Sequence, residues 1–282
     1  MLSFKLFNTL KDIINNAYPE SEYPDNKFKK FYLDVIPKEM KSIHGRYYSQ
    51  SKKIEVFNLS RPTGHIVSTT IHEASHHIDH CLRHASDHTK AFYEVMHNML
   101  ITAMGMGIIT TNDILTANDS KDKERLIKYF GDIESWEIRN IDYKQAIVTF
   151  KITNCFSIKD CLKEREYKYS GEEQCWIKDI NKTEQEAETL FLSEIIDMNN
   201  VKIVEGNEID IEAVYYICVL NSYECKDFLK ENGYLWNGYK IKKNSWTKKI
   251  LAKNKDKELD KISSLQSKGV KIQLVSKKLI HK

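Results

Sequence analysis

The chain has few of the residues that mark disordered, membrane-spanning or secreted proteins. Its 282 residues contain ten glycines and four prolines, whereas aromatic residues make up 11%. This composition is typical of a globular chain, and the length is sufficient for two domains. No apolar run approaches the ~20 residues that cross a bilayer. The N-terminus lacks the layout of a signal peptide, so we expect a cytoplasmic protein with no membrane partner.

Cysteine is also used sparingly, and the six cysteines form no Cys-x-x-Cys pair. A chain of this size without a signal sequence has little reason to form disulfides, so we expect reduced, mostly buried thiols. A second metal site built from Cys155, Cys161 and Cys175 is the alternative.

The net charge is only +3, but it is unevenly distributed. Residues 239–282 contain 14 lysines against three acidic residues, a local charge of +11, which leaves −8 for the remainder. Such asymmetry favours an acidic partner for the lysine-rich C-terminal region, with nucleic acid as the first candidate. A solvated lysine surface without a partner is the alternative.

The segment 71–76, Ile-His-Glu-Ala-Ser-His, has the pattern of a zinc-hydrolase centre. On a helix, His72 and His76 are about 400° apart in rotation and roughly 6 Å apart along the axis, so both imidazoles face one way. Two such nitrogens can share one tetrahedral zinc. Glu73 lies roughly 100° round the helix, where it can accept a proton from a zinc-bound water without coordinating the ion.

A catalytic zinc needs a third protein ligand and an open position for water. The remaining candidates nearby are His77, His80, His84, His88 and His97. A straight helix points His77 away from the pair and carries His80 too far along the axis. His84 has the same limitation unless the helix breaks early.

His88 is the third ligand that we predict. It follows Ser86 and Asp87, either of which can cap a new helix and let the chain fold back. Apolar residues repeat at three- and four-residue steps from Phe92 to Leu100, as expected for a second helix that presents His88. The predicted metal ligands are therefore His72, His76 and His88, with Glu73 as the catalytic residue and Zn²⁺ as the cofactor.

Four segments in this order resemble the SprT-like (Spartan-type) metallopeptidases. They are residues 45–48 (Gly-Arg-Tyr-Tyr), 53–56 (Lys-Ile-Glu-Val), 69–73 (Thr-Thr-Ile-His-Glu) and 88–92 (His-Thr-Lys-Ala-Phe). The resemblance covers roughly residues 25–110. It departs from the family pattern at Thr89, where glycine is usual, and in lacking the Cys-x-x-Cys pairs of a zinc ribbon.

The resemblance implies a zincin-like α+β domain, in which a short hairpin leads into the active-site helices, that cleaves peptide bonds. It implies zinc ligands at His72, His76 and His88 and a general base at Glu73. Arg46, Tyr47 or Tyr48 on the hairpin could line the cleft or stabilise the oxyanion. Packing of the two tyrosines on the hairpin is the alternative.

The C-terminal half contains matching segments that predict an internal duplication. Residues 159–164 (Lys-Asp-Cys-Leu-Lys-Glu) match residues 226–231 (Lys-Asp-Phe-Leu-Lys-Glu), and the register continues through Gly171 and Gly238. After a three-residue insertion, Trp176 aligns with Trp246. Each copy reads as β-α-β-β-α-β, which predicts two small sheet-and-helix modules. The tryptophans are either core residues or, if exposed, a stacking surface for single-stranded nucleic acid.

Together these patterns predict an α+β chain: a zincin-like metallopeptidase domain in residues 1–110, a helical connector in 111–145, and duplicated βαββαβ modules in 146–206 and 207–282. In the connector, Thr111 or Asn112 can cap one helix, and Asp119 or Ser120 another. We expect a zinc metallopeptidase that acts on protein or peptide substrates, with C-terminal modules for substrate or nucleic-acid targeting.

Two alternatives remain open at this point. One is a metal-bearing protein that binds nucleic acid or protein, with incidental or lost proteolysis. The other is a zinc hydrolase that acts on a non-protein bond.

Overall fold

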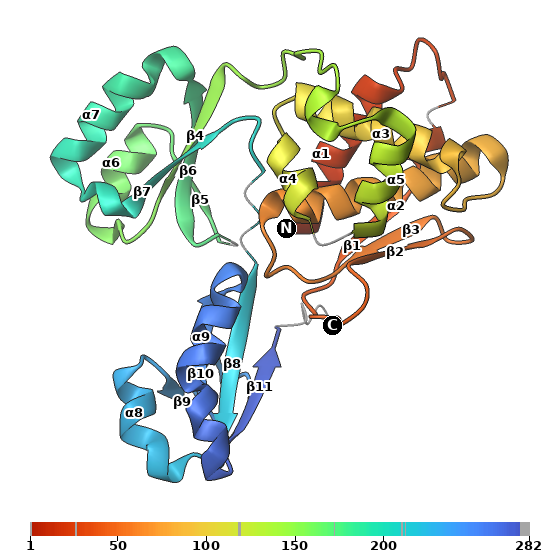
Figure 1. Cartoon of the computed structure of the whole chain (residues 1–282). Coiled ribbons are helices and arrows are strands. Elements are labelled where there is room, and N and C mark those ends of the chain that lie inside the picture. Colours follow the sequence, from red (N-terminus) through yellow and green to blue (C-terminus); the bar gives the residue numbers. More distant parts are fainter. Residues whose placement is uncertain are drawn as a thin grey trace.

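The computed structural model describes residues 2–25, 27–117, 120–171, 173–209, 211 and 213–276. The architecture is mixed α+β, with three small sheets. Figure 1 shows three parts: an N-terminal part with helices α1–α5 beside one sheet, and two sheet-and-helix modules formed by the C-terminal half. Within the described ranges, no helix is both long enough and apolar enough to cross a membrane.

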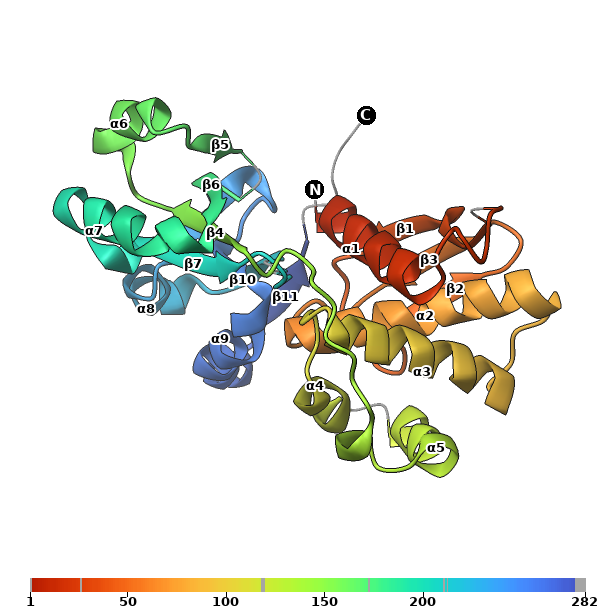
Figure 2. The ribbon, with the colours of Figure 1, turned by 90° about the horizontal axis from the view of Figure 1, so that it is seen from above.

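The N-terminal part packs three long helices against a three-stranded sheet. Its elements are α1 (Leu2–Ala17), η1 (Lys27–Lys29), β1 (Tyr32–Val35), β2 (Gly45–Tyr48), β3 (Lys53–Val56), α2 (Thr63–Arg83) and α3 (Lys90–Gly105). Strands β2 and β3 form an antiparallel hairpin, and β1 pairs with β3 in parallel, so the strand order is β1-β3-β2. Helices α1 and α2 contact the sheet, and α3 contacts both helices (Figure 2).

Helix α2 has a buried apolar face and a more open polar face. Ile71, Ala74 and Ile78 recur at three- and four-residue steps and are fully buried. Because an α-helix has 3.6 residues per turn, this burial turns His72 and His76 together toward the more open side, where both are half-buried. The apolar spacing of α2 therefore fixes the direction of the histidine pair.

The segment expected to be a connector packs onto the N-terminal part. It contains α4 (Thr111–Thr116), α5 (Ser120–Phe130) and η2 (Ile133–Ser135). Ile114, Leu126 and Ile133 are buried in the same core as the residues of α1, α2 and α3. This segment is thus an integral part of the N-terminal fold.

The cap of α4 is one residue earlier than expected from the sequence. Thr110, instead of Thr111 or Asn112, accepts a hydrogen bond from the Asp113 amide, and the Asp113 carboxylate accepts one from the Thr110 amide. This capping box satisfies two amide donors that the start of the helix leaves unpaired. Of the two caps expected for the next helix, Asp119 lies outside the described residues and Ser120 is the first residue of α5.

The first C-terminal module, here module 1, has its own core. Its elements are β4 (Ile147–Ile152), η3 (Phe156–Ile158), α6 (Lys159–Glu164), β5 (Lys168–Ser170), β6 (Cys175–Asn181), η4 (Lys182–Glu184), α7 (Gln185–Ile195), η5 (Met198–Asn200) and β7 (Val201–Glu205). The strand order is β5-β6-β4-β7, and all neighbouring pairs are antiparallel. Val148, Phe150 and Leu162 are fully buried in this core.

Module 2 has the same order of strands and helices. Its elements are β8 (Val214–Leu220), η6 (Tyr223–Cys225), α8 (Lys226–Glu231), β9 (Leu235–Trp236), η7 (Gly238–Lys240), β10 (Trp246–Leu251), η8 (Ala252–Asn254), α9 (Lys255–Ile262), η9 (Ser263–Lys268) and β11 (Lys271–Val275). The strand order is β9-β10-β8-β11, which places the second, third, first and fourth strands side by side, as in module 1. All three pairs are again antiparallel.

The two modules share a buried polar cluster at matching positions. In module 1 the Tyr167 hydroxyl donates to Glu188 at 2.9 Å, and Lys178 lies 3.6 Å from the same carboxylate. In module 2 the Tyr234 hydroxyl donates to Glu258 at 3.1 Å, and Lys248 lies 2.8 Å from it. Each buried carboxylate therefore has both a hydrogen-bond donor and a cation.

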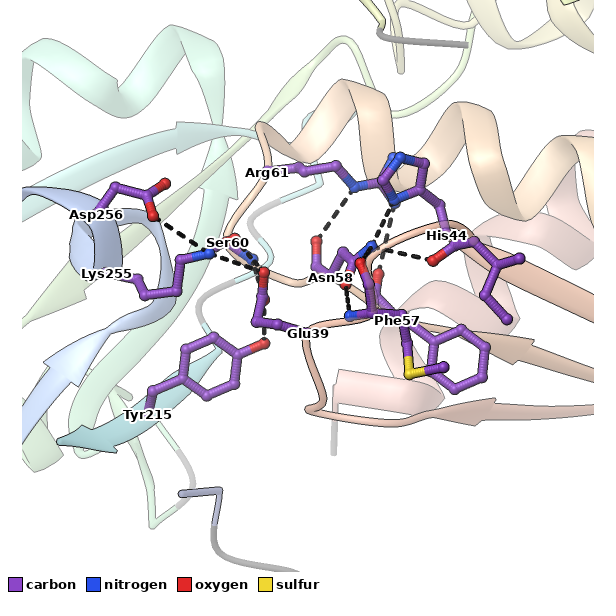
Figure 3. A network of polar contacts seen from close by, with 11 residues as sticks. Glu39, His44, Phe57, Asn58, Ser60, Arg61, Tyr215, Lys255 and Asp256 are labelled. Carbon is purple, nitrogen blue, oxygen red and sulfur yellow. Dashed lines mark hydrogen bonds and ion pairs between the residues drawn. The ribbon is translucent and has the colours of Figure 1, made fainter. Parts of the chain in front are cut away.

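Module 2 belongs to the same apolar core as the N-terminal part, and it also contacts this part through Glu39, in the loop between β1 and β2 (Figure 3). The Glu39 carboxylate accepts hydrogen bonds from the Tyr215 hydroxyl at 2.6 Å and the Ser60 hydroxyl at 2.8 Å, and Lys255 lies 2.9 Å away. Burial alone would raise the pKa of Glu39, but these three donors outweigh it and hold the pKa below its ordinary value. Glu39 is therefore a charged link between β8, α9 and the loop.

Asn58 fixes the other end of this loop. It is buried, and its amide donates to the carbonyl oxygens of Met40 and Ile43 at 3.1 and 3.0 Å. The chain between Glu39 and Gly45, the first residue of β2, is thus held from both sides (Figure 3).

Candidate metal centre

Helix α2 and the turn after it bring three imidazoles together. The ring centroids of His72 and His76 are 4.9 Å apart, and the His88 centroid lies 5.1 Å from the first and 4.7 Å from the second. Nε2 of His88 is 3.2 Å from Nε2 of His72. One nitrogen from each ring lies within 4.8 Å of the others, so this group could hold one metal ion.

The turn that delivers His88 is held by Arg83. Helix α2 ends there, and His84 adopts a left-handed conformation with φ of 60° that stops the helix. The Arg83 guanidinium donates to both oxygens of Asp79 at 2.6 and 2.7 Å and to Asp87 at 3.1 Å. A planar guanidinium that holds two carboxylates in this way fixes the reversal of the chain.

The expectation that Ser86 or Asp87 caps the next helix is wrong. The residue that precedes α3 is Thr89, which is extended, so His88 lies in the turn and not on the second helix. The two expected caps have other partners: the Ser86 hydroxyl lies 2.7 Å from Nδ1 of His76, and Asp87 accepts from the Thr89 hydroxyl at 2.8 Å. The serine thus orients a histidine instead of starting the helix.

An aspartate from α5 orients His72. Oδ2 of Asp122 lies 2.7 Å from Nδ1 of His72, and its other oxygen accepts a hydrogen bond of 2.8 Å from the Tyr93 hydroxyl. Burial alone would raise the pKa of Asp122, but its contacts with His72 and Tyr93 outweigh this effect and lower it, so the carboxylate stays charged. A carboxylate on the outer nitrogen of a histidine leaves Nε2 for a metal and raises the basicity of the ring.

The electrostatic environment favours the neutral form of His76 and His88. Burial, together with His72 and His88 nearby, lowers the pKa of His76 to about 3. Burial and His72 also lower the pKa of His88. Neutral imidazole is the form that coordinates a metal, and three imidazole nitrogens suit a borderline divalent ion such as zinc. The donor set, its outer contacts and the neutral form of His76 and His88 therefore fit a divalent metal ion such as zinc.

Glu73 is buried against the start of β2. A side-chain carbon added at Gly45 would lie 2.6 Å from Cγ of Glu73 and 2.7 Å from its Oε1, closer than real contacts. Gly45 is therefore needed to leave room for the carboxyl group beside strand β2. The glutamate is only 7% exposed, so its carboxyl group is largely shielded from bulk water.

Both hairpin tyrosines have hydrogen-bond partners within the protein. The Tyr47 hydroxyl lies 3.1 Å from Nδ1 of His77, and the Tyr48 hydroxyl donates to Glu55 at 3.0 Å. These contacts favour the packing interpretation of the pair. Arg46 is exposed and donates to the Tyr48 hydroxyl at 3.2 Å.

The other histidines considered as ligands have structural contacts elsewhere. His77 is fully buried beside Tyr47 and Phe31, which lowers its pKa to about 4. His84 is the C-cap of α2, and His97 stacks on Phe130 with ring centroids 4.2 Å apart. The ring of His80 lies near Tyr47.

The alternative cysteine site receives no support from the geometry. All six cysteines are free thiols, and four of them are buried. In the part of the chain that the structure describes, His72, His76 and His88 are the only group of three or more His, Cys, Asp or Glu side chains close enough to share an ion.

Sequence reasoning missed Asp122, Tyr93, Ser86 and Gly45 as supports of the site. No local pattern marks Asp122, because it lies on a different helix from the residue it contacts.

Comparison with models of protein families finds no match for this chain, and comparisons with curated proteins and with solved structures find none either.

Proposed function

We propose that the chain is a zinc-dependent metallopeptidase with a zincin-like, SprT-like domain over residues 25–110. The observation that carries the proposal is the meeting of one nitrogen each from His72, His76 and His88 within 4.8 Å, with the first two on a helix that also carries Glu73. A purely structural zinc would fill all four positions with protein ligands, whereas three ligands leave one open. The resemblance of the hairpin and helix segments supports the same activity.

The residues of the site have distinct roles in this proposal. When bound, zinc would lower the pKa of a water molecule and polarise the scissile carbonyl. His72, His76 and His88 hold the ion, while Asp122 and Ser86 fix two of the rings through their outer nitrogens. Glu73 accepts the proton of the attacking water and returns it to the leaving amine.

The two C-terminal modules are proposed to be duplicates that target the enzyme to its substrate or to nucleic acid. Their identical strand order and the Tyr-Glu-Lys clusters at matching positions support a common origin. Module 2, which we propose to be part of this targeting unit, contacts Glu39 in the loop that leads to β2.

The test of the activity separates zinc binding from chemistry. Zinc-loaded wild-type protein is incubated with unfolded casein, with and without a chelator, beside the variants Glu73→Gln and Glu94→Gln. We expect Glu73→Gln to keep its zinc and lose activity roughly 100-fold or more, since general-base catalysis contributes about that much. Glu94, exposed on α3, serves as the matched control and should behave as wild type. Wild-type cleavage by Glu73→Gln would contradict the mechanism.

A second candidate is a metal-bearing nucleic-acid- or protein-binding protein with incidental or lost proteolysis. The positive charge of module 2, which contains 16 lysines and nine acidic residues in 207–282, favours it. Nucleic-acid binding by a fully zinc-loaded protein that cleaves no peptide would support this candidate over the first.

A further inference from the structure

The two modules expose an aromatic residue and a lysine at matching positions. Phe156 in module 1 and Tyr223 in module 2 each begin a 3-10 turn before a short helix, and they are 80% and 81% exposed. The ammonium group of Lys159 lies 4.4 Å from the centroid of the first ring, and that of Lys226 lies 5.1 Å from the second. Large aromatic rings so exposed are candidates for contact with a partner.

A second aromatic pair lies on the short strand of each module. Tyr169 on β5 is 57% exposed and packs against Trp176, while Trp236 on β9 is 54% exposed and packs against Trp246. Both pairs have ring centroids 5.7 Å apart. Trp176 and Trp246 are partly buried, so the exposed stacking surface of each pair is carried mainly by the residue of the short strand, Tyr169 or Trp236.

The two modules differ in the sign of their net charge. Residues 146–206 contain eight Lys and Arg against 12 acidic residues, a net charge of −4. Residues 207–282 contain 16 lysines against nine acidic residues, a net charge of +7. Of the two modules, module 2 is therefore the one whose net charge attracts a polyanion.

In module 2 the aromatic side chains line one groove of about 720 Å³. Its walls include Tyr223, Lys226, Trp236 and Trp246, together with Asn221, Asn244 and one acidic residue, Glu224. The rings come from η6, β9 and β10, so three elements present aromatic surface to the same space. The asparagines offer amide donors and acceptors, and Lys226 offers a cation, beside rings on which a base can stack.

We propose that this groove binds single-stranded nucleic acid, with bases stacked on Trp236 and Tyr223 and the backbone directed to Lys226. Every base has a flat face, so stacking of this kind tolerates many sequences, and duplex DNA does not offer its base faces. A peptide partner would need no cationic surroundings, whereas the net charge of module 2 complements phosphate. This inference deepens the targeting role proposed above for the modules, and it does not rest on the metal centre.

The test is binding of the full-length protein to labelled single strands of roughly 16 nucleotides, the upper site size of one small nucleic-acid-binding fold. Fluorescence anisotropy is measured with oligo-dT, oligo-rU, a duplex of the same length and an abasic strand that carries phosphates without bases. We expect single strands to bind more tightly than the duplex and the abasic strand. The DNA and RNA arms identify which nucleic acid is preferred.

Matched variants of the two modules locate the binding site. Trp236→Ala should weaken single-strand binding by roughly five- to 100-fold, the range for losing one stacked base, whereas Tyr169→Ala at the equivalent position of module 1 should leave it unchanged. Lys226→Gln should weaken binding and reduce the slope of log affinity against log salt by about one. His72→Ala should bind single strands as tightly as the wild type does. Single-strand binding can then be judged independently of whether the peptidase proposal is correct.

Three results would overturn the proposal. They are no binding of any single strand at low salt, equal binding of the abasic strand, or equal losses in Trp236→Ala and Tyr169→Ala. Circular dichroism of each variant shows whether it is folded. If Trp236→Ala is not folded, Trp236→Phe and Tyr223→Ala are compared instead. Trp236→Phe keeps a ring and should retain most of the single-strand binding, whereas Tyr223→Ala should lose it. Equal binding by these two variants would also overturn the proposal.

Discussion

Oδ2 of Asp122 on α5 lies 2.7 Å from Nδ1 of His72 on α2. This contact joins the helical segment after residue 110 to the candidate metal centre, and the Tyr93 hydroxyl on α3 holds the other oxygen. Three helices therefore determine the orientation of one imidazole.

The first prediction concerns this contact. Asp122→Asn should reduce zinc affinity roughly 10- to 100-fold, because the outer partner of a metal-bound histidine fixes its tautomer and raises its basicity. Competition with a chromophoric chelator measures the affinity. Glu124→Gln, an exposed change on the same helix, is the control and should have no effect. Equal zinc affinity in Asp122→Asn and wild type would show that the contact does not support the metal.

A second prediction follows from the space beside Glu73. Gly45→Ala should displace the carboxyl group and lower the rate of peptide hydrolysis by roughly 100-fold, because misplacing a catalytic group by about 1 Å has that effect. Zinc content should stay at the wild-type level, because the atoms nearest to an added carbon at Gly45 belong to Glu73, which is not a predicted ligand. Gly171→Ala, where an added carbon meets nothing within 4 Å, is the control. Wild-type activity of Gly45→Ala would show that the space at Gly45 does not determine the position of a catalytic Glu73.

The third prediction is the pH dependence of the metal-free protein. The pKa of His76 is lowered to about 3 and that of His77 to about 4, mainly by burial. Unfolded histidines titrate near 6.5, so between about pH 4 and 6.5 the unfolded state binds more protons, and the free energy of unfolding rises with pH there. Urea denaturation in the presence of chelator, repeated across this range, measures it. A flat profile would contradict the burial of neutral imidazoles.

The fourth prediction concerns the attachment of module 2. Tyr215→Phe removes a donor from the partly buried Glu39 carboxylate and should lower the free energy of unfolding by about 1–3 kcal/mol. Tyr223→Phe, which removes an exposed hydroxyl in the same module, should change it by less than about 0.5 kcal/mol. Chemical denaturation measures both. Equal stability of the two variants would argue against the Glu39 link.

Part of this fold could be predicted from the sequence because its signals are local. The apolar period of residues 66–78 predicts both the helix and the side that His72 and His76 share, since both follow from 3.6 residues per turn. The order of strands and helices in the C-terminal half could be read from alternation and from glycine positions.

The rest depends on contacts between distant segments, which leave no local pattern. Asp122 reaches His72 only because Leu126 and Ile133 bury α5 and η2 against the N-terminal core. Ser86 looked like a cap because a serine before a helix often is one, but its hydroxyl lies beside His76. The same holds for Glu39, whose partners Tyr215 and Lys255 lie in the last module.

The most direct test of the central claim is zinc stoichiometry by mass spectrometry of the wild-type protein beside His72→Ala, His76→Ala and His88→Ala. The structure brings these three imidazoles, and no other group of potential ligands in its described residues, within 4.8 Å of one another. We predict about one zinc per chain in the wild type, as one tetrahedral site requires, and loss of bound zinc in each variant. His97→Ala, which changes a histidine stacked on Phe130, should keep its zinc. Stoichiometric zinc in His88→Ala, or none in the wild type, would contradict the account.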